Sequence, residues 1–342
     1  MGHAPARRTF VLLLFATACS SAPRCSGPVT DHFDGQTFRN LGPYDQPSGR
    51  DFVRWQLSGR GKPWPGWVER LPDPSPPSRV ESGLRITMIN HATTLVQMDG
   101  VNLVTDPVWS DGVGPVPWLG PRRHKAVGVA FDALPTVHVV LISHDHYDHL
   151  DLPTLRRLAA RDRPVIFAGL GTAALLAHDG IPGAVDLDWW QTSTAIPGLA
   201  ITFAPAQHWS QRSLDDRDTV LWGSFFVKGR ESSVFYAGDT GWGPHFAAVR
   251  RRLGAPTAAI LPIGAYEPRW FMRNQHIDPA EAVKAHLVLG AGLSVGVHWG
   301  TFDLSDEAIG APARAFRRAA RRAGLPAGAA VPLDNGQWVT AP

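Results

Sequence analysis

The sequence predicts an α/β protein of the α+β kind, a four-layer αββα sandwich in which two β-sheets pack together and helices cover the outside. Three observations support this fold class. Strand-like runs outnumber helix-like segments, hairpin connections are mixed with longer crossovers, and each half of the chain contains both kinds of segment. The 342 residues, of which 44% are hydrophobic and 18% charged, have a globular composition and can bury a large core.

The first half of the chain contains hairpin strands, a buried strand and a helix. Strand-like runs are found at residues 84–89, 95–98, 101–104 and 137–142. Asp99-Gly100 joins the second run to the third, and such a two-residue turn favours glycine because it requires positive φ. The fourth run is continuously apolar, which is typical of a strand buried on both faces. A helix is predicted to begin after Asp151, whose side chain is placed to cap it.

The second half repeats this mixture of strands and helices. Strands are predicted at residues 200–204, 221–227, 234–237, 258–263 and 293–297, and helices at residues 244–253 and 312–323. A further helix is predicted to begin at Asp278, because Pro279 suits the first helical position and Glu281 completes a capping box. No short-period repeat or low-complexity tract divides the chain, so residues 33–342 are predicted to form one catalytic domain.

The N-terminus has the pattern of an export signal. Arg7 and Arg8 precede an apolar stretch at residues 10–18, which is far shorter than the ~20 residues that span a bilayer. Residues 1–18 are therefore predicted to be a signal peptide, and residues 19–32 a flexible tether rich in Ser, Pro and Gly. The arginine pair also resembles a twin-arginine signal for folded proteins, and a generic basic start is the alternative.

Small residues before Cys19 resemble a bacterial lipoprotein processing site. This pattern favours an exported lipoprotein that is anchored to the membrane through Cys19 and faces the periplasm or the cell exterior. The same Ala-x-Ala motif suits ordinary signal cleavage, which would release a soluble periplasmic or secreted protein. Cys19 and Cys25 are the only cysteines in the sequence, and both precede the predicted domain. Any metal ligands in that domain must therefore be histidines and carboxylates.

The distribution of charge limits the classes of partner. The formal net charge of +3 is too small to indicate a nucleic-acid partner. The helix predicted at residues 312–323 carries five arginines along one side, namely Arg314, Arg317, Arg318, Arg321 and Arg322. This arrangement suits either a solvated helix face or contact with anionic lipid.

The strongest functional signal is the run His-Asp-His-Tyr-Asp-His at residues 144–149, which directly follows a buried strand. A loop that leaves a strand end is firmly anchored, yet it can direct several side chains toward one point. His144 and His146 can bind one metal ion, while Asp148 and His149 reach a second. Imidazole and carboxylate are the ligands that zinc takes where no thiolate is available. A solvated polar loop is the alternative interpretation.

Three further residues of the ligand type, His208, Asp239 and His298, follow apolar runs. Glycines beside Asp239 and His298 let backbone segments pass closely. Each residue alone is a weak candidate, since a single histidine at a strand end is usually structural. Together with residues 144–149 they make seven ligands, the number that suits two metal ions sharing a bridging carboxylate and a water.

This ordered set resembles the metallo-β-lactamase superfamily, whose signature is H-x-H-x-D-H followed by separate His, Asp and His ligands. Longer stretches resemble the branch that contains N-acyl phosphatidylethanolamine phospholipase D and its bacterial relatives. These stretches lie at residues 33–40, 105–110, 143–151, 188–190, 205–212, 237–241, 261–270 and 298–302. One departure is Asn90, which precedes His91 where the family usually has glycine. We expect this change to alter the local turn and to touch no ligand.

The resemblance implies a metallo-β-lactamase-type fold and a site for two zinc ions. It implies that one zinc is held by His144, His146 and His208, the other by Asp148, His149 and His298, and that Asp239 bridges them. Two zinc ions lower the pKa of a bridging water toward neutrality and stabilise charge that builds on a phosphate. Asp148 is also expected to orient the nucleophile.

Two other residues are expected near this site. His276 resembles a family histidine beside the substrate phosphate, so it is predicted to contact substrate or to donate a proton, with a hydrogen-bonded structural role as the alternative. Asp106, in Thr-Asp-Pro, is expected to orient a metal ligand through a hydrogen bond. A turn-capping aspartate is the alternative for Asp106.

These expectations combine into a prediction of function. The chain is predicted to be a zinc phosphodiesterase that cleaves a phospholipid-like substrate in the phospholipase D sense, by attack of a metal-activated hydroxide on phosphorus. One alternative keeps the metal site and changes the substrate to a lactone or another ester. A second alternative is a surface lipoprotein that binds metal without turnover, but metal storage needs neither a bridging carboxylate nor an activated water. The sequence does not specify an oligomeric state.

Overall fold

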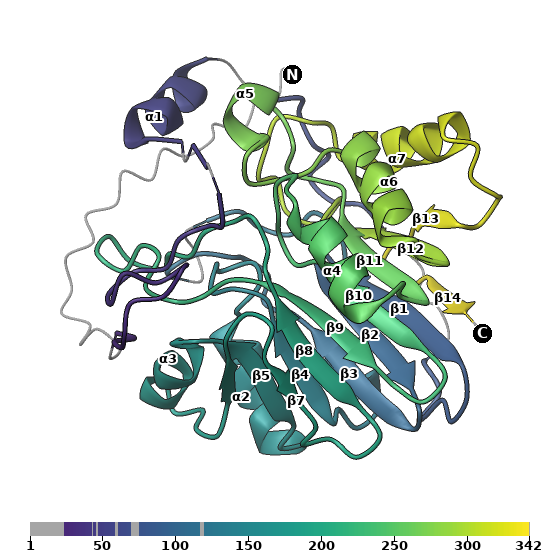
Figure 1. Ribbon diagram of the computed structural model, residues 1–342. Helices are drawn as coiled ribbons and strands as arrows, with labels where there is room; N and C mark the ends of the chain where they lie inside the picture. The colour runs from purple at the N-terminus through teal and green to yellow at the C-terminus, as the bar shows by residue number, and fades with distance from the viewer. Residues whose placement is uncertain are drawn as a thin grey trace.

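Two mixed β-sheets pack face to face in the computed structural model of the protein, which describes residues 24–42, 44–45, 47–58, 61–69, 75–116 and 120–341. The predicted signal peptide and Cys19 lie outside these residues. Helices cover the outer face of each sheet, so the four-layer αββα sandwich expected from the sequence is confirmed (Figure 1).

Each sheet of the described chain has seven strands and is antiparallel on one side and parallel on the other. The first sheet contains, in spatial order, β14 (Trp338–Ala341), β1 (Leu84–Asn90), β2 (Thr93–Met98), β3 (Val101–Thr105), β4 (Val139–Ile142), β5 (Val165–Gly169) and β6 (Val185–Leu187). The second contains β13 (Ala330–Pro332), β12 (Leu293–Val297), β11 (Ala258–Pro262), β10 (Ser233–Tyr236), β9 (Ser224–Lys228), β8 (Ala200–Ala204) and β7 (Thr192–Ser193). The predicted hairpin is β2–β3, with φ of 51° at Asp99 and 75° at Gly100.

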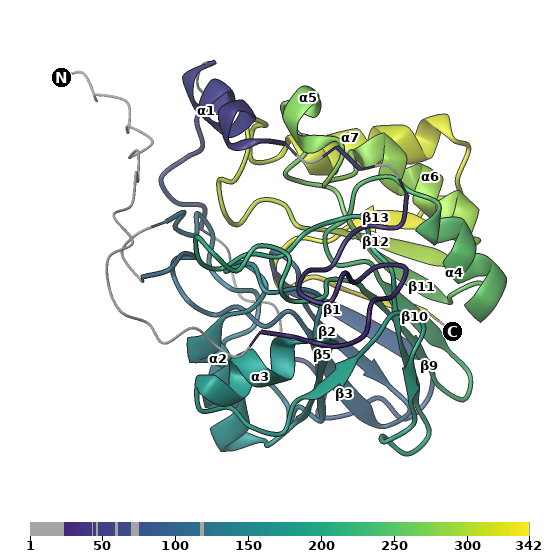
Figure 2. The ribbon, with the colours of Figure 1, turned by 60° about the vertical axis from the view of Figure 1, so that its left-hand side comes forward.

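The helices lie on opposite outer faces of the sandwich. The first sheet is covered by α2 (Leu152–Arg161) and α3 (Thr172–His178), and the second by α4 (His245–Leu253), α6 (Pro279–Leu289) and α7 (Ala311–Arg322) (Figures 1 and 2). Two further helices, α1 (Gly49–Leu57) and α5 (Arg269–Met272), contact each other through the stacked rings of Trp55 and Phe271. A 3-10 turn spans Phe131–Ala133. None of the helices in the described ranges combines the length and apolar character that a bilayer crossing requires.

Side-chain alternation explains why the strands are apolar on both faces. In β4, Val139 and Leu141 point into the core between the sheets, whereas Val140 and Ile142 pack toward α2 beside Leu155. Successive strand residues point to opposite faces, so a strand covered on both sides is continuously apolar. The second sheet has the same arrangement toward α4, α6 and α7. The result is three apolar layers, with the middle layer supporting both sheets.

The capping predictions had different outcomes at two helices. In α6, the Asp278 carboxylate accepts hydrogen bonds from the backbone N–H groups of Ala280 and Glu281, and Glu281 Oε2 accepts from the Asp278 N–H, so the capping box is confirmed. At α2, Asp151 occupies the cap position, but its side chain makes no capping hydrogen bond. The carboxylate instead accepts from the Ser110 hydroxyl at 2.8 Å, so the predicted cap at Asp151 is wrong.

Two predicted boundaries also differ from the structure. The strand predicted at 221–227 begins only at Ser224, because the Leu221 and Gly223 N–H groups donate to carbonyls of Leu170 and Ser143 rather than to a strand neighbour. Residues 24–32, assigned to the tether, include Cys25, which packs on the core, and His32, whose Nε2 lies 2.7 Å from the carboxylate of Asp188. Packing therefore begins before residue 33.

Candidate metal centre

The loop that follows β4 carries the predicted ligand run. It is anchored at Ser143, whose N–H donates to Asp106 Oδ1 at 2.7 Å and whose carbonyl accepts from the Gly223 N–H at 2.9 Å. The chain then turns back at once, because the N–H groups of His149 and Leu150 both donate to the carbonyl of His146. This tight turn directs side chains from both ends of the run toward the same point between the two sheets.

A first group of ring nitrogens is formed by His144, His146 and His208. His146 Nδ1 lies 2.9 Å from His144 Nε2 and 3.3 Å from His208 Nε2. Donor atoms about 3.3 Å apart suit tetrahedral coordination at the roughly 2.0–2.1 Å bond length of zinc and histidine. Burial lowers the pKa of His146 and that of His208 to about 3. Both rings are therefore neutral, which is the form that binds metal.

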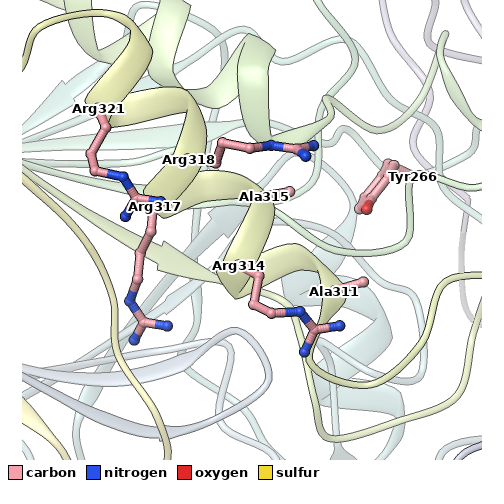
Figure 3. A pocket seen from close by; sticks show the side chains of 7 residues that line it. All are labelled: Tyr266, Ala311, Arg314, Ala315, Arg317, Arg318 and Arg321. Carbon is pink, nitrogen blue, oxygen red and sulfur yellow. The ribbon is translucent and has the colours of Figure 1, made fainter.

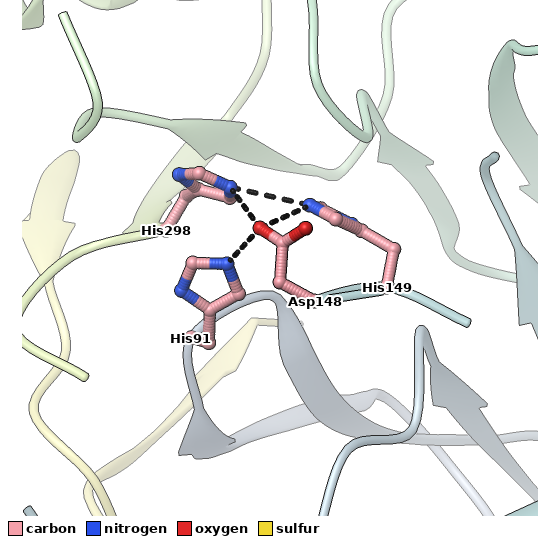
Figure 4. A group of neighbouring side chains, drawn as sticks. All are labelled: His91, Asp148, His149 and His298. Atoms are coloured by element: carbon pink, nitrogen blue, oxygen red, sulfur yellow. Dashed lines mark hydrogen bonds and ion pairs between the residues drawn. The ribbon is translucent and has the colours of Figure 1, made fainter. Parts of the chain in front are cut away.

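A second group is formed by Asp148, His149 and His298 (Figure 4). His149 Nε2 lies 3.2 Å from His298 Nε2, and Asp148 Oδ2 lies 3.4 and 3.5 Å from these two nitrogens. Burial lowers the pKa of His298, but the carboxylates of Asp239 and Asp148 outweigh burial and raise this pKa to about 9. The group therefore attracts positive charge, and a divalent cation would replace the protons.

Asp239 lies between the two groups. Its Oδ2 is 3.2 Å from His149 Nε2, 3.1 Å from His298 Nε2 and 4.0 Å from His208 Nε2. Burial opposes ionisation, yet His149 and His298 hold the pKa of Asp239 well below its usual range. Within the described residues, the buried Oδ1 of Asp239 has no hydrogen-bond partner. A buried carboxylate oxygen without a partner is costly, and a bound cation would satisfy it, so the donor set fits a metal.

Asp106 orients one residue of the second group. Its Oδ2 lies 2.6 Å from His149 Nδ1 and also accepts hydrogen bonds from the hydroxyls of Ser143 and Tyr236 at 2.5 Å. The contact with His149 is the geometry expected from the sequence, in which the carboxylate fixes the ring so that Nε2 faces the other ligands. His208 is held in the same manner, since its Nδ1 lies 3.0 Å from the Gln275 carbonyl.

His276 lies at the edge of the cluster, close to the first group. Its Nδ1 is 3.7 Å from Asp239 Oδ2, and its ring centre is 5.3 Å from that of His208. In the described part of the chain, Nδ1 has no hydrogen-bond partner. The structure therefore places His276 beside the ligand groups, as expected, while its role toward substrate stays a prediction.

His91 is the residue of this site that the sequence interpretation missed. Its Nε2 lies 2.9 Å from Asp148 Oδ2, and its ring centre is 4.0 Å from that of His298. The Asn90 amide donates to the Val108 carbonyl rather than to a predicted ligand, as expected, and the effect of Asn90 on the local turn stays a prediction. The signal for His91 was present in the sequence, because it follows an apolar run in the same manner as His298.

The structure thus brings together all seven side chains predicted as ligands, together with Asp106 and His276. The two groups of side chains meet at Asp239, which is buried and lies close to residues of both groups. The ligand roles themselves stay predictions.

Comparisons with known proteins agree with this fold and site. The family model for the beta-lactamase superfamily domain matches residues 101–299. The chain is 38% identical over 234 residues to N-acyl-phosphatidylethanolamine-hydrolyzing phospholipase D 1 of Caenorhabditis elegans, covering 66% of each protein. It is 34% identical over 227 residues to the mitochondrial N-acyl-phosphatidylethanolamine-hydrolyzing phospholipase D of Saccharomyces cerevisiae, covering 65% of this chain and 48% of the yeast protein. The chain therefore spans about two thirds or less of the length of these relatives.

Solved structures show the same fold at lower identity. A metallo hydrolase from Ignicoccus hospitalis matches with a TM-score of 0.60 and 22% identity, covering 76% of this chain and 99% of that one. An isothiocyanate hydrolase from Delia radicum gut bacteria matches with a TM-score of 0.59 and 18% identity, covering 75% of this chain and all of that one (100%).

An αββα sandwich with histidine and aspartate ligand groups buried between its sheets defines the class of metal-binding proteins with the metallo-β-lactamase fold. The chain belongs to the metallo-β-lactamase superfamily. Within the superfamily it resembles the N-acyl phosphatidylethanolamine phospholipases D, to two of which it is 38% and 34% identical.

Proposed function

We propose that this protein is a metal-dependent phosphodiesterase that binds two zinc ions and hydrolyses a phospholipid-like substrate in the phospholipase D sense. The observation that supports this proposal is the pair of buried ligand groups that meet at Asp239, with a carboxylate oxygen left for a cation. Relatives that are 38% and 34% identical are named as N-acyl phosphatidylethanolamine phospholipases D.

In this proposal each residue of the cluster has a defined task. One zinc ion is held by His144, His146 and His208, the other by Asp148, His149 and His298, and Asp239 contacts both. The bound zinc ions would supply an activated water and neutralise a phosphate group. The protein supplies neutral, buried imidazoles and fixes the ring of His149 through Asp106.

Two side chains at the rim of the cluster are proposed to act on the substrate. The His276 side chain is 11% exposed, so one edge of its ring reaches solvent beside Asp239. It is placed to bind a substrate phosphate or to donate a proton to the leaving alkoxide. The Asp148 side chain is 15% exposed and can accept a hydrogen bond from the attacking water, which orients the nucleophile.

The test is hydrolysis of bis(p-nitrophenyl) phosphate and of N-acyl phosphatidylethanolamine by the zinc-loaded full chain. We expect metal-dependent release of p-nitrophenol and of phosphatidic acid. Asp239→Asn should lower both rates by more than about 100-fold, because it removes a ligand that both metals share. Asp132→Asn is the matched control, since the Asp132 side chain is 95% exposed and should leave both rates unchanged.

If the zinc-loaded protein hydrolyses neither substrate, the phosphodiesterase proposal is contradicted. Hydrolysis of a lactone or a carboxylic ester in their place would establish the alternative substrate class for the same metal site. Equal rates for wild type and Asp239→Asn would remove the metal centre from the reaction.

A further inference from the structure

His91 contacts two members of the second group, Asp148 through its side chain and His298 through its backbone. The side chain is only 2% exposed, and its Nε2 lies 2.9 Å from Asp148 Oδ2 (Figure 4). Its other ring nitrogen, Nδ1, is buried and has no hydrogen-bond partner in the described part of the chain. A proton on Nδ1 would be buried without an acceptor, so the proton belongs on Nε2, where Asp148 accepts it.

The backbone of His91 is tied to the loop that carries His298. The His298 N–H donates to the His91 carbonyl at 2.7 Å, and the His91 N–H donates to the Thr301 hydroxyl at 3.0 Å. His91 and His298 both adopt positive φ, 45° and 63°, which is uncommon for residues other than glycine. Such backbone conformations persist where neighbouring contacts hold them, and here the two strained residues hold each other.

We infer that His91 is a positioning residue for the second metal. It donates the Nε2 proton to Asp148 Oδ2 and thereby fixes the carboxylate toward His149 and His298. This inference rests on the proposed metal centre, but it concerns the affinity for metal rather than the substrate. Hydrogen-bonding partners of metal ligands typically contribute about 10- to 100-fold to metal affinity.

The test is calorimetric titration of zinc into the metal-free full chain, without substrate. In His91→Phe, which keeps a ring but has no donor, one of the two binding steps should weaken about 10- to 100-fold while the other stays unchanged. His91→Gln should restore most of that affinity, because its amide can donate from a similar position. His286→Phe is the matched control, since His286 is also buried but hydrogen-bonds Ser294 on the far side of the second sheet.

Three outcomes would overturn the inference. His91→Phe could leave both binding steps unchanged, or it could weaken them no more than His286→Phe does, which would indicate a general packing effect. Loss of one zinc in both His91→Phe and His91→Gln would show instead that His91 is itself a ligand. Because no substrate is present, each outcome is distinguishable from failure of the proposed phosphodiesterase activity.

The outer face of α7 carries an independent observation. All five of its arginines are exposed. Four of them, Arg314, Arg317, Arg318 and Arg321, border an open hollow beside Tyr266 (Figure 3). The helix contains no acidic residue. Some exposed arginines elsewhere on the surface pair with carboxylates, as Arg24 does with Asp215 at 2.9 Å and Arg156 with Asp179 at 3.1 Å. Among the described residues, none of the α7 arginines forms an ion pair with a carboxylate within 4.0 Å.

The inner side of α7 lies beside the predicted metal centre. Pro312, in its first turn, lines a small cavity together with His91 and His298. We propose that the arginine face of α7 binds the anionic headgroups of a bilayer, where guanidinium groups can pair bidentately with phosphate. The proposal rests on the proposed function, since a phospholipid-like substrate would be supplied by that same surface.

The test is binding of the full chain to vesicles of phosphatidylcholine with or without 30% phosphatidylglycerol, in a Cys19→Ser background that excludes lipid attachment at residue 19. We expect salt-sensitive binding to the anionic vesicles only. Replacing Arg314, Arg317 and Arg321 with Gln should weaken that binding roughly 100-fold. The matched control replaces the three arginines in the last turn of α4, namely Arg250, Arg251 and Arg252.

Equal binding to both kinds of vesicle, or equal loss of binding in the α4 control, would overturn the role of α7. Hydrolysis of soluble bis(p-nitrophenyl) phosphate should be the same in both triple variants and in wild type. If wild type also fails to hydrolyse that soluble substrate, the proposed function is contradicted. The result of the vesicle-binding experiment is not affected by that outcome.

Discussion

At the scale of single residues, the site depends on a buried carboxylate whose negative charge is stabilised by neighbouring histidines. Asp239 is ionised although it is buried, because His149 and His298 lie about 3 Å from its Oδ2. A carboxylate in such a position cannot be exchanged for its amide without removing the charge that holds the surrounding groups. This is why one conservative substitution at Asp239 tests both ligand groups at once.

His245 permits a pH prediction outside the ligand set. Burial lowers the pKa of His245 to about 3, and its ring packs against Phe246 with centres 4.1 Å apart. In the unfolded chain a histidine has a pKa near 6.5, so below that pH the unfolded state binds a proton that the folded state excludes. Stability contributed by neutral His245 is therefore present above about pH 6.5 and is lost as the pH falls toward 3.

We expect wild type to lose about 2 kcal/mol more unfolding free energy than His245→Gln between pH 7 and pH 5, at about 1.4 kcal/mol per pH unit below the unfolded pKa. Urea unfolding at the two pH values measures this difference. Both proteins keep the same ligand histidines, whose contributions cancel in the comparison. Parallel losses in the two proteins would show that His245 can be protonated inside the fold.

At the scale of secondary-structure elements, site residues follow strand ends. His91 follows β1, Asp106 follows β3, the run at 144–149 follows β4, and His298 follows β12. An apolar strand fixes the backbone, and the first residues beyond it can direct polar side chains into the space between the sheets. The sequence shows an apolar run before each of the four segments predicted to carry ligands, namely residues 144–149, His208, Asp239 and His298. This is why the ligand set could be predicted before the fold was known.

Contacts between residues far apart in sequence account for what the sequence could not predict. His91 follows an apolar strand, as the predicted ligands do, but a lone histidine after a strand is usually structural. Only its contact with Asp148 distinguishes it. The Asp151 carboxylate is at a cap position, yet the hydroxyl of Ser110, which is 41 residues away in sequence, competes successfully for it. Local patterns cannot include partners that only the tertiary fold brings close.

Strands at the edges of the sheets were the elements most often missed. β7 has two residues, β6 and β13 have three each, and β14 has four, so none is long enough to show a hydrophobic period. β14 exists because β1 offers it an open edge, with Leu84 paired to Ala341. β5 is different, since its Val-Ile-Phe-Ala-Gly run carries the apolar signal of a buried strand and was predictable.

At the scale of the whole molecule, the predicted ligands come from both sheets. The loop after β4 carries His144, His146, Asp148 and His149, whereas loops of the second sheet carry His208, Asp239 and His298. The N-terminal segment adds a further tie, because the Asn40 side chain donates to the His208 carbonyl at 2.7 Å and accepts from the His208 N–H at 3.0 Å. The centre therefore assembles only when the two halves and this segment are folded together.

The measurement that tests the metal centre most directly is the zinc content of the purified full chain, determined by mass spectrometry of the metal alongside Asp239→Asn. We expect about two zinc ions per chain in wild type and no more than about one in the variant, because Asp239 is the only ligand that both groups share. Wild type that binds less than about one zinc after reconstitution, or a variant that keeps both ions, would contradict a two-metal centre bridged by Asp239.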